Sequence, residues 1–490
     1  MNAIVNDKPF VRTFAVPSGI ATKKLGIKVS PTTGKKKIAV STNWLPIFGF
    51  EAGAEVVERS LGPNKGMEII LLSDFESFAG NTFDLFNTEE VKLKKKIVYQ
   101  REYKARKNNP LETLIEVASQ KIIDDSFPRD TTRVHVTFSQ SIITITPLTT
   151  HQEEALKNIT PESKHEVFAA CTSGVDLHSL ENDHGMSIHS VIEFRPHEAR
   201  DGKRDLSETG ALTVLRNVKN IGNLFNEDIT YIDASRLEAA VKNSPVTTFM
   251  ASPVCDDFTN VKNKKAKEDS IENLTSSIDQ SFDLLRCIYA IKPPLICFEQ
   301  VRGWYKSDAY KILNLRLRKL GYKENLLIAD PRDYEGKTSR VRGYAVFTVL
   351  DSPFEFEAKT TRSNETIWDL VKKYLPECRD VSHSKSIQKG KAKGRLRVIN
   401  KSSLHSPTFL KSQPRMAGDS VVVEDEGKFY WPCEGLQKEL MGILPTFTTD
   451  ASSMEIALEC LGQSIDGAVH DSVIRSLKKH IDAHIALRSY

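Results

Sequence analysis

The sequence predicts an α/β fold built on a Rossmann-like, doubly wound parallel sheet, and three observations lead to that prediction. From about residue 165, apolar runs of strand length alternate with amphipathic segments of helical spacing. The runs lie at 166–171, 187–194, 247–252 and 293–301. Residues capable of chemistry follow each run directly, where open sheets of this kind bind their ligands.

The spacing of apolar residues divides the chain into five parts. Residues 1–90 predict a β-rich domain, 91–160 an α+β region, and 161–350 the strand–helix series. Residues 351–430 are basic and weakly periodic, and residues 431–490 return to helical spacing.

Individual elements follow from the same patterns. In the first part, strands are predicted at 37–45, 53–61 and 66–72. The second part predicts a helix at 110–125, with proline at its first turn, and a hairpin formed by RVHVTF and SIITITPL. The series closes with a helix at 308–322 and the strands NLLIAD and RGYAVFTVL.

Composition and cysteine usage exclude several classes of protein. The chain has 490 residues, of which 40% are hydrophobic and 27% charged, as in a protein with a sizeable core. No apolar run approaches the roughly 18 residues of a membrane span, and the first residues lack the apolar stretch of a signal peptide. Seven scattered cysteines predict free thiols, and no Cys/His spacing suggests a metal site. We therefore expect a cytoplasmic protein without membrane contact or metal.

One segment stands out by its charge, although the net charge of the whole chain is only +4. No acidic residue occurs between Ser382 and Gly418, a stretch with nine lysines and arginines. It is either a solvated basic loop or a segment that lies on a phosphate backbone. For the second interpretation the candidate contacts are Lys389, Lys391, Lys393, Arg395 and Arg397.

The first two strand ends predict a nucleotide-like ligand site. The first run leads into a turn of small residues, with Ala170, Thr172, Ser173 and Gly174 as candidates to cradle the ligand. Glu193 ends the second run, where a carboxylate can bond ribose hydroxyls. An ordinary tight turn and a surface glutamate remain the alternatives.

The later strand ends carry reactive groups. Cys255 follows the third run in a polar loop, where a thiolate forms more easily than in a core. Glu299 ends the fourth run, and burial there would raise its pKa and favour a proton donor. Arg340 and Arg342 enter the last strand with their side chains on one face, as an anion or carbonyl site or as a salt-bridged edge strand.

This succession of motifs resembles the cytosine carbon-5 DNA methyltransferase family, from about 166 to 350 and again from about 400 to 485. The resemblance implies S-adenosylmethionine as cofactor. VFAACTSGVDL is similar to the family's Phe-x-Gly-x-Gly-Gly loop and VIEFRPHEA to the strand whose glutamate holds the ribose. ITYIDASRL is similar to the segment that supplies an aspartate to the adenine, and its spacing to the cysteine favours Asp233 over Asp228.

The catalytic motifs resemble the family in the same order. ASPVCDDFT is similar to the Pro-Pro-Cys loop, which implies Cys255 as nucleophile and Pro253 beside the cofactor. ICFEQVRGW implies Glu299 as the acid that binds the base. DYEGKTSRVRGYAVF is similar to the Gln-x-Arg-x-Arg region, mapped onto Thr338, Arg340 and Arg342. ALECLGQSIDGAV is similar to the closing motif, with Gln463 and Ser464 at the cofactor.

The resemblance implies a methyl transfer to carbon 5 of a cytosine flipped out of duplex DNA, through a covalent Cys255 adduct. Residues 161–350 would form the catalytic and cofactor-binding domain, completed by 431–490, with 351–430 as target-recognition region. Such enzymes occur in restriction–modification. Several motif positions are substituted, since Val254, Gln300, Thr338 and Gln463 replace family residues and the first loop keeps only Gly174. An RNA cytosine carbon-5 methyltransferase and a catalytically decayed DNA-binding regulator are the alternatives.

The first 160 residues lie outside the family's core. The stretch from Lys37 to Leu72 faintly resembles the swapped-hairpin β-barrels of bacterial transition-state regulators and related toxins. That resemblance implies nucleic-acid binding and a homodimer formed through this domain. The alternative is an accessory β-rich domain without an assigned role.

Overall fold

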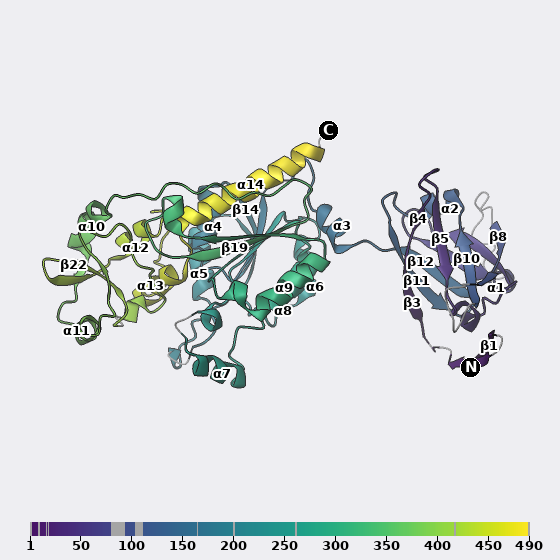
Figure 1. Ribbon diagram of the computed structural model, residues 1–490, viewed down its shortest axis with the longest axis horizontal. Coiled ribbons are helices and arrows are strands. Elements are labelled where there is room, and N and C mark those ends of the chain that lie inside the picture. The colour runs from purple at the N-terminus through teal and green to yellow at the C-terminus, as the bar shows by residue number, and fades with distance from the viewer. Residues whose placement is uncertain are drawn as a thin grey trace. The chain divides into compact units, whose positions relative to one another are not determined.

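The computed structural model describes residues 2–7, 10–15, 17, 19–79, 94–102, 111–163, 165–198, 201–259, 262–415 and 418–488 (Figure 1). The chain divides into two compact units, residues 1–150 and 151–490. We describe each unit by itself.

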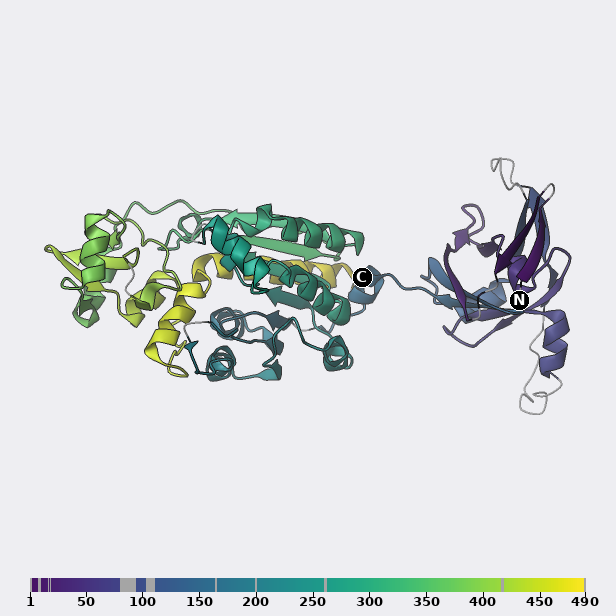
Figure 2. The ribbon, with the colours of Figure 1, turned by 90° about the horizontal axis from the view of Figure 1, so that it is seen from below.

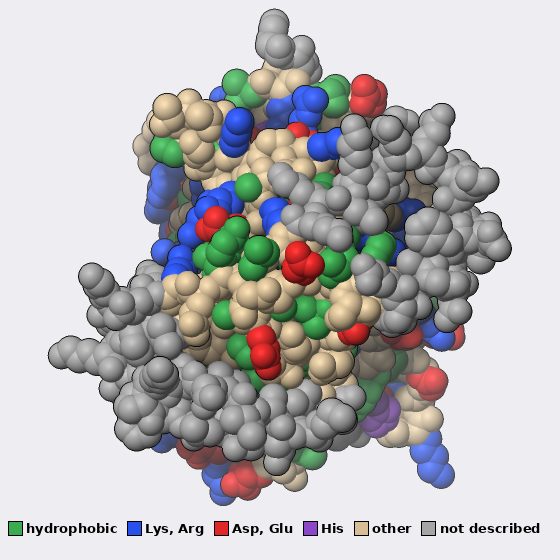
Figure 3. All heavy atoms as spheres, turned by 90° about the vertical axis from the view of Figure 1, so that its right-hand side faces the viewer, with side chains coloured by type: hydrophobic (Ala, Val, Ile, Leu, Met, Phe, Trp, Pro, Cys, Tyr) green, Lys and Arg blue, Asp and Glu red, His purple; other side chains and the backbone are tan. Residues whose placement is uncertain are grey.

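The N-terminal unit is built from β-strands around one hydrophobic core. A six-stranded sheet has the order β3-β11-β12-β7-β6-β8, and a four-stranded sheet the order β4-β5-β10-β9. The strands are β3 (Ala21–Gly26), β4 (Lys28–Val29), β5 (Lys36–Ser41), β6 (Glu55–Ser60), β7 (Met67–Leu71), β8 (Lys94–Ile97), β9 (Tyr99–Glu102), β10 (Leu111–Val117), β11 (Arg133–Ser139) and β12 (Ile142–Pro147). Short helices are η1 (Leu45–Phe48), α1 (Leu72–Ala79) and α2 (Gln120–Ser126), and β1 (Asn2–Asp7) pairs with β2 (Phe10–Ala15). On the face of this unit in Figure 3, hydrophobic side chains are interspersed with charged ones.

The predicted strands and the hairpin of this unit are confirmed, but the helix predicted at 110–125 is wrong. Residues Leu111–Val117 form β10, which pairs with β5, and only Gln120–Ser126 is helical. Ile115 and Val117 both enter the core, and this period of two outweighs the helical spacing of the same residues. The pairing of β5 with β10 crosses the predicted boundary at residue 90, so 1–90 and 91–150 share one core.

The second unit contains a seven-stranded sheet of the order β15-β14-β13-β16-β17-β19-β18. Its strands are β13 (Glu166–Ala170), β14 (Ser187–Ile192), β15 (Ile221–Phe225), β16 (Thr248–Ala251), β17 (Leu295–Gln300), β18 (Lys323–Ala329) and β19 (Arg342–Thr348). The helices around it are α3 (His151–Leu156), α4 (Val175–Asn182), α5 (Thr209–Asn217), α6 (Ala234–Val241), α7 (Lys264–Glu272), α8 (Gln280–Ile291) and α9 (Asp308–Lys319).

Helices cover both faces of this sheet (Figure 2). Alternate side chains of β13 point to opposite faces, as the period of a strand requires. Phe168 joins the core formed with α6, α8 and α9, whereas Val167 joins the core formed with α4, α5 and the C-terminal helix. The doubly wound α/β prediction is therefore confirmed.

The sheet differs from the prediction in one respect, because it is mixed rather than wholly parallel. β19 runs antiparallel to both β17 and β18. A hairpin-like connection returns the chain directly from β18 to β19, so no crossover helix is available to make the last strand parallel. β15 was not predicted, since its residues IGNLF are only half-buried and include a glycine.

The region 351–430 forms a small four-stranded sheet of the order β20-β23-β22-β21. Its elements are α10 (Trp368–Tyr374), η6 (Leu375–Glu377), β20 (Arg379–Asp380), α11 (Lys385–Ala392), β21 (Arg397–Ile399), η7 (Gln413–Arg415), β22 (Val421–Asp425) and β23 (Lys428–Trp431). The helices α12 (Glu434–Leu440), α13 (Met454–Gln463) and α14 (Gly467–Arg488) follow, as the helical spacing predicted. Within the described ranges, no helix is long and apolar enough to cross a membrane.

Candidate active site

Cys255 lies in a loop that two glutamine side chains hold in place. The loop follows β16, and the Nε2 of Gln300, at the end of the neighbouring β17, donates to the carbonyl of Pro253. The backbone N–H of Val254 donates to Oε1 of Gln280 at 2.8 Å, and the Ser277 hydroxyl donates to the carbonyl of Val254 at 3.3 Å. The residues on both sides of the loop therefore fix the backbone just before the thiol.

Asp257 anchors the far side of the same loop, a role that we did not predict. Its carboxylate accepts from Nζ of Lys262 at 2.6 Å and from the hydroxyl of Ser276 and the N–H of Ser277, both at 2.9 Å. Burial acts to raise the pKa of Asp257, but the hydrogen bonds, led by that of Lys262, outweigh it and lower the pKa to about 2. The paired acids after the cysteine, with serines some 15 to 20 residues later, were the available sequence signal.

Glu299 and Arg342 lie next to each other at the carboxyl end of β17. Nε of Arg342 is 3.3 Å from Oε1 of Glu299, close enough for an ion pair although not aligned as a hydrogen bond. Burial raises the pKa of Glu299, and the charges of Arg342 and Arg340 oppose that rise. On balance the pKa of the carboxyl group is raised, which favours its protonated form.

Cys255 belongs to the same charge cluster. Burial and the charge of Asp256 raise the pKa of its thiol, whereas Arg342 and Arg340 act to lower it. The structure thus brings together the four residues predicted to be catalytic, and each of the two arginines favours a thiolate at Cys255.

Arg340 differs from Arg342, because the protein's own backbone occupies most of its guanidinium. Nη1 donates to the carbonyls of Phe409 at 2.9 Å and Gly462 at 3.1 Å, and Nη2 donates to the carbonyl of Gln463 at 3.0 Å. Burial lowers the pKa of Arg340 to about 9. Its Nε finds no hydrogen-bond partner among the described residues. The expectation that Arg340 holds a base oxygen or a phosphate is therefore left to Nε and to the second N–H of Nη2.

Thr338 and the closing segment meet beside this arginine. The hydroxyl of Thr338 donates to Asp466 at 2.6 Å, and burial raises the pKa of Asp466 to about 6. Ser464 is buried and donates to the carbonyl of Leu461 at 2.8 Å, whereas the side chain of Gln463 is exposed. The loop between α13 and α14 is thus joined to the start of β19 through Arg340 and Thr338.

The turn after β13 contains the residues predicted to cradle a ligand, and we call it the cradle. Gly174 adopts a φ of +88°, and its N–H donates to the hydroxyl of Thr172 at 3.0 Å. That hydroxyl in turn donates to Asp176. A Cβ on Gly174 would come within 3.2 Å of Val214, so this position combines a left-handed backbone with close packing. Ala170 is buried directly before the turn.

Glu193 lies against this cradle, where burial raises its pKa to about 8. The charge of Asp176 adds to that rise, and a hydrogen bond from the backbone of Thr172 opposes it. A Cβ on Gly210 would lie 2.0 Å from Oε1 of Glu193, so only glycine leaves room there for the carboxyl group.

The surroundings of the cradle are acidic and suit a ligand with positive charge. The pKa of Cys171 is raised first by burial and then by Glu193 and Asp228, and that of Cys460 is raised to about 12 by burial, Glu193 and Asp176. The Cys460 thiol donates to the carbonyl of Ser173 at 3.5 Å, which packs α13 onto the turn. A sulfonium ligand such as S-adenosylmethionine fits this field.

The structure places Asp233 elsewhere than we predicted. Asp233 is exposed and is the N-cap of α6, where its carboxylate accepts from the N–H and hydroxyl of Ser235, each at 2.9 Å. The spacing argument had set Asp228 aside. Its charge helps to raise the pKa of Cys171, in the cradle. The Asn-Glu-Asp that directly follows β15 was the signal, but β15 itself had not been recognised.

The predicted phosphate contacts divide into two groups. Lys389, Lys391, Lys393 and Arg395 are exposed at and just beyond the C-terminal end of α11, and Nζ of Lys391 lies 4.8 Å from the ring centre of Phe429. Arg397 is turned inward, since it donates to the carbonyls of Asp419 at 2.7 Å and Thr408 at 2.6 Å. It therefore fixes the fold of this region and is poorly placed to contact DNA.

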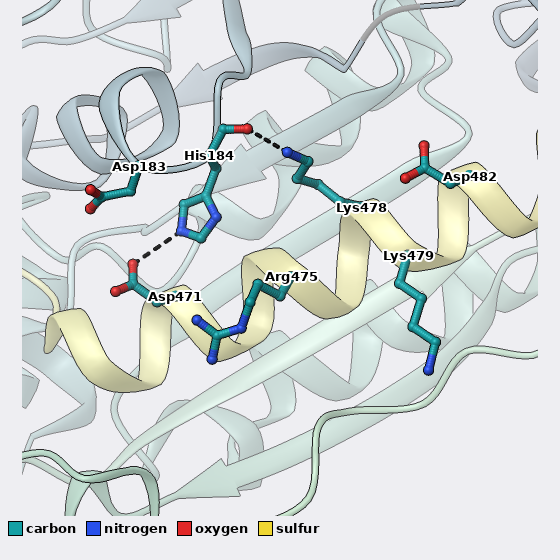
Figure 4. A pocket seen from close by; sticks show the side chains of 7 residues that line it. All are labelled: Asp183, His184, Asp471, Arg475, Lys478, Lys479 and Asp482. Atoms are coloured by element: carbon teal, nitrogen blue, oxygen red, sulfur yellow. Dashed lines mark hydrogen bonds and ion pairs between the residues drawn. The ribbon is translucent and has the colours of Figure 1, made fainter.

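A pocket of about 600 Å³ runs along α14 (Figure 4) and is lined by none of the predicted site residues. There His184 lies 3.1 Å from Asp471, and Lys478 donates to the carbonyl of His184. Across the described ranges, no group of three His, Cys, Asp or Glu residues is arranged to hold a metal ion.

Comparison with known families agrees with this geometry. Residues 208–431 match the family model of the C-5 cytosine-specific DNA methylases, and the matched range contains Cys255, Glu299, Arg340 and Arg342. The chain carries a C-5 cytosine-specific DNA methylase domain. The resemblance to this family is thereby confirmed, and the motifs that precede residue 208 or follow residue 431 lie outside the matched range. No curated protein matches the chain.

Two solved structures resemble this chain. The methyltransferase EhMeth of Entamoeba histolytica is 21% identical, with a TM-score of 0.50, over 65% of this chain and 99% of that one. The Dnmt2 methyltransferase of S. pombe is 17% identical, with a TM-score of 0.48, over 64% of this chain and 98% of that one. At this identity the first likeness shows the fold alone.

Proposed function

We propose that this methylase is a DNA (cytosine-5-)-methyltransferase that uses S-adenosylmethionine and attacks a flipped-out cytosine with Cys255. The observation that carries the proposal is the cluster of Cys255, Glu299 and Arg342 at the end of β17, where Arg342 lies 3.3 Å from Glu299 and acts on the thiol of Cys255.

The cluster supports the first step of the reaction. Carbon 6 of cytosine accepts a nucleophile when negative charge that develops on the ring is neutralised. Arg342 and Arg340 lower the cost of forming the Cys255 thiolate, and Glu299, whose pKa burial raises, donates a hydrogen bond to ring nitrogen 3. Attack by sulfur then makes carbon 5 nucleophilic. Loss of the carbon 5 proton after methylation restores the ring and expels Cys255.

The residues of the cradle are proposed to hold the cofactor. When bound, S-adenosylmethionine supplies an electrophilic methyl group on a sulfonium sulfur. The backbone groups of Thr172, Ser173 and Gly174 would contact it. Glu193 would offer its carboxyl group to the ribose. The α13–α14 loop, with Gln463 and Ser464, would close one side of the cofactor site. Pro253 leads into the catalytic loop from the same sheet edge. In place of Asp233, we now propose Asp228 for the adenine.

The choice of DNA over RNA rests on the match to the C-5 cytosine-specific DNA methylase model, while the exposed lysines of α11 offer contacts to the phosphates of either nucleic acid. Transfer of a tritiated methyl group to duplex DNA and to transfer RNA, measured side by side, tests it. Label in DNA is expected. Label in RNA alone would contradict the substrate proposed here, and failure to bind S-adenosylmethionine in calorimetry would instead favour a decayed, non-enzymatic regulator.

A further inference from the structure

The two sheets of the N-terminal unit have strand orders that read the same from either end. We call residues 21–71 the first half and residues 94–147 the second half. Within the described residues, the first half runs β3, β4, β5, η1, β6 and β7, and the second runs β8, β9, β10, α2, β11 and β12. Each strand can be numbered from one to five by its position within its own half. In these numbers, the strand order of the smaller sheet is 2-3-3-2 and that of the larger sheet is 1-4-5-5-4-1.

We infer that the two halves are copies of one structural unit, related by an approximate two-fold axis, and that each completes the other by exchange of strands. The N-terminal unit is then a whole two-fold assembly contained in one chain. This inference is independent of the proposed methyl transfer.

The pairing at the centre of each sheet is reciprocal, as in a two-fold interface. If a residue of the first half pairs with a residue of the second, their symmetry equivalents pair with each other as well. In the smaller sheet, Ile38 pairs with Val117 and Val40 pairs with Ile115. Ile38 and Ile115 then occupy equivalent positions, as do Val40 and Val117, and all four are fully buried.

The larger sheet repeats this reciprocity. Met67 of β7 pairs with Ile145 of β12, and Ile69 pairs with Ile143. Both central pairings, β5 with β10 and β7 with β12, are antiparallel, as a two-fold axis perpendicular to a sheet requires. Two independent sheets therefore share one symmetry.

The outer strands show the exchange. β3 of the first half pairs with β11 of the second, and β8 of the second half pairs with β6 of the first, again both antiparallel. Neither half contributes its first strand to its own hairpin. Each half by itself would leave its hairpin with an open edge.

The short helices contact the opposite half in equivalent ways. At the end of η1, the carbonyl of Phe48 accepts from the N–H of Ser141, in the hairpin turn of the second half, at 3.0 Å. At the end of α2, the carbonyl of Ser126 accepts from the N–H of Gly66, in the hairpin turn of the first half, at 2.9 Å. The same contact is thus made twice, once from each half.

These contacts change what the resemblance to swapped-hairpin barrels implies. A barrel of that kind needs a second copy of the chain, which led us to expect a homodimer through this domain. Here the position of the second copy is filled by the second half, and both halves contribute to a single core. The partner of each half is therefore the other half of the same chain.

Disulfide trapping in the full-length protein tests this directly. Ala39 and Glu116 face each other across β5 and β10, and Glu68 and Thr144 across β7 and β12. Directly opposed strand residues have Cα separations that a disulfide can span. We expect the double variants Ala39→Cys/Glu116→Cys and Glu68→Cys/Thr144→Cys, when oxidised with diamide, to run as monomers on non-reducing gels and to lose two titratable thiols each.

A matched control pair lies within one half. Arg59 and Glu68 are opposed on β6 and β7, so Arg59→Cys/Glu68→Cys gives an intramolecular bond whatever the arrangement of the halves. The four single variants report any bonds made by the seven native cysteines. A disulfide-linked dimer from either test pair would overturn the inference in favour of two exchanged chains. If the test pairs stay reduced while the control pair oxidises, the two halves do not pair as inferred.

Discussion

Nε of Arg342, the first residue of β19, lies 3.3 Å from Oε1 of Glu299, near the end of β17. The two meet because β19 is antiparallel to β17, so the start of one strand adjoins the end of the other. The single reversed strand of the sheet therefore builds the charge pair beside Cys255.

Arg342 and Arg340 are expected to respond differently to replacement by methionine. Arg342→Met removes the cation nearest Glu299, so the pKa values of both Glu299 and the Cys255 thiol rise and the pH optimum of kcat moves upward. We expect a loss in kcat of about 10²-fold or more with little change in Tm. The measurement is kcat against pH, with Arg475→Met, which removes a surface pair with Glu357, as control.

Arg340→Met instead leaves three backbone carbonyls without their donor. Each buried carbonyl left unpaired costs about 1 kcal/mol or more, so we expect unfolding to become easier by about 3 kcal/mol. Thermal unfolding measures it. An unchanged Tm with lost activity would mean that Arg340 acts on the substrate and not on the fold.

Cys255→Ser is expected to abolish methyl transfer and leave DNA affinity within a factor of two or so, because the hydroxyl is a poor nucleophile of nearly the same size. Methyl transfer and fluorescence anisotropy on the same DNA measure the two effects. Cys433→Ser, at a half-buried thiol before α12, is the matched control. Turnover retained by the Cys255 variant would exclude the covalent mechanism.

Cofactor binding is expected to release a proton near pH 7. Burial and the charge of Asp176 hold the pKa of Glu193 at about 8, so its carboxyl group is largely protonated before binding. A cationic sulfonium in the cradle stabilises the carboxylate and lowers that pKa. Calorimetry in buffers of different ionisation enthalpy measures the release, which should be smaller for S-adenosylhomocysteine, whose sulfur carries no charge, and absent in Glu193→Gln.

The same carboxyl group gives a pH dependence to stability. Its pKa in the folded chain, about 8, lies above its ordinary value near 4.5, so between these values the folded state binds more protons than the unfolded state. The contribution of Glu193 to stability is therefore present at low pH and declines as pH rises toward 8. Chemical denaturation from pH 5 to pH 8 should show a smaller decline in Glu193→Gln.

Asp228→Asn should weaken S-adenosylmethionine binding by about tenfold, whereas Asp233→Asn should leave it unchanged. Asp228 acts on the cradle, while Asp233 caps α6 at the surface, where asparagine caps a helix about as well as aspartate. Titration calorimetry of both variants decides between the residues. The reverse order would restore the choice made from sequence spacing.

Replacing Lys389, Lys391 and Lys393 together by alanine should weaken DNA binding and flatten its salt dependence. For every lysine that pairs with a phosphate, its removal lowers the slope of log K against log salt by about 0.9. The matched control is Lys311, Lys319 and Lys323 replaced together, three exposed lysines on and after α9. Equal affinity of the two triple variants would place the DNA contact outside α11.

Wherever a strand end could be recognised, the residues predicted there lie close together in the structure. Cys255, Glu299 and Arg342 follow or begin strongly apolar runs, and the structure brings them together. Asp228 was considered but set aside for Asp233, because β15 is short, contains Gly222 and is half-buried, so its end carried no apolar signal.

Tertiary pairing decided what local patterns could not. Residues 110–125 contain apolar positions that satisfy both a period of two and a helical spacing, and only the pairing with β5 selects the strand. Arg340 and Arg342 look alike in sequence, yet their roles diverge because carbonyls near 409 and 462 reach only Arg340. Neither interaction can be inferred from neighbouring residues.

The helix α14 has a consequence for synthesis on the ribosome. Val473 and Leu477 lie in the core on one side of the sheet, and Asp471 accepts a hydrogen bond from Ser179 of α4, almost three hundred residues earlier. The second unit therefore cannot complete its fold until α14 has left the exit tunnel, whereas the N-terminal unit has all its strands by residue 147 and can fold long before. A nascent chain stalled before α14 would carry a folded first unit and an unfinished enzyme.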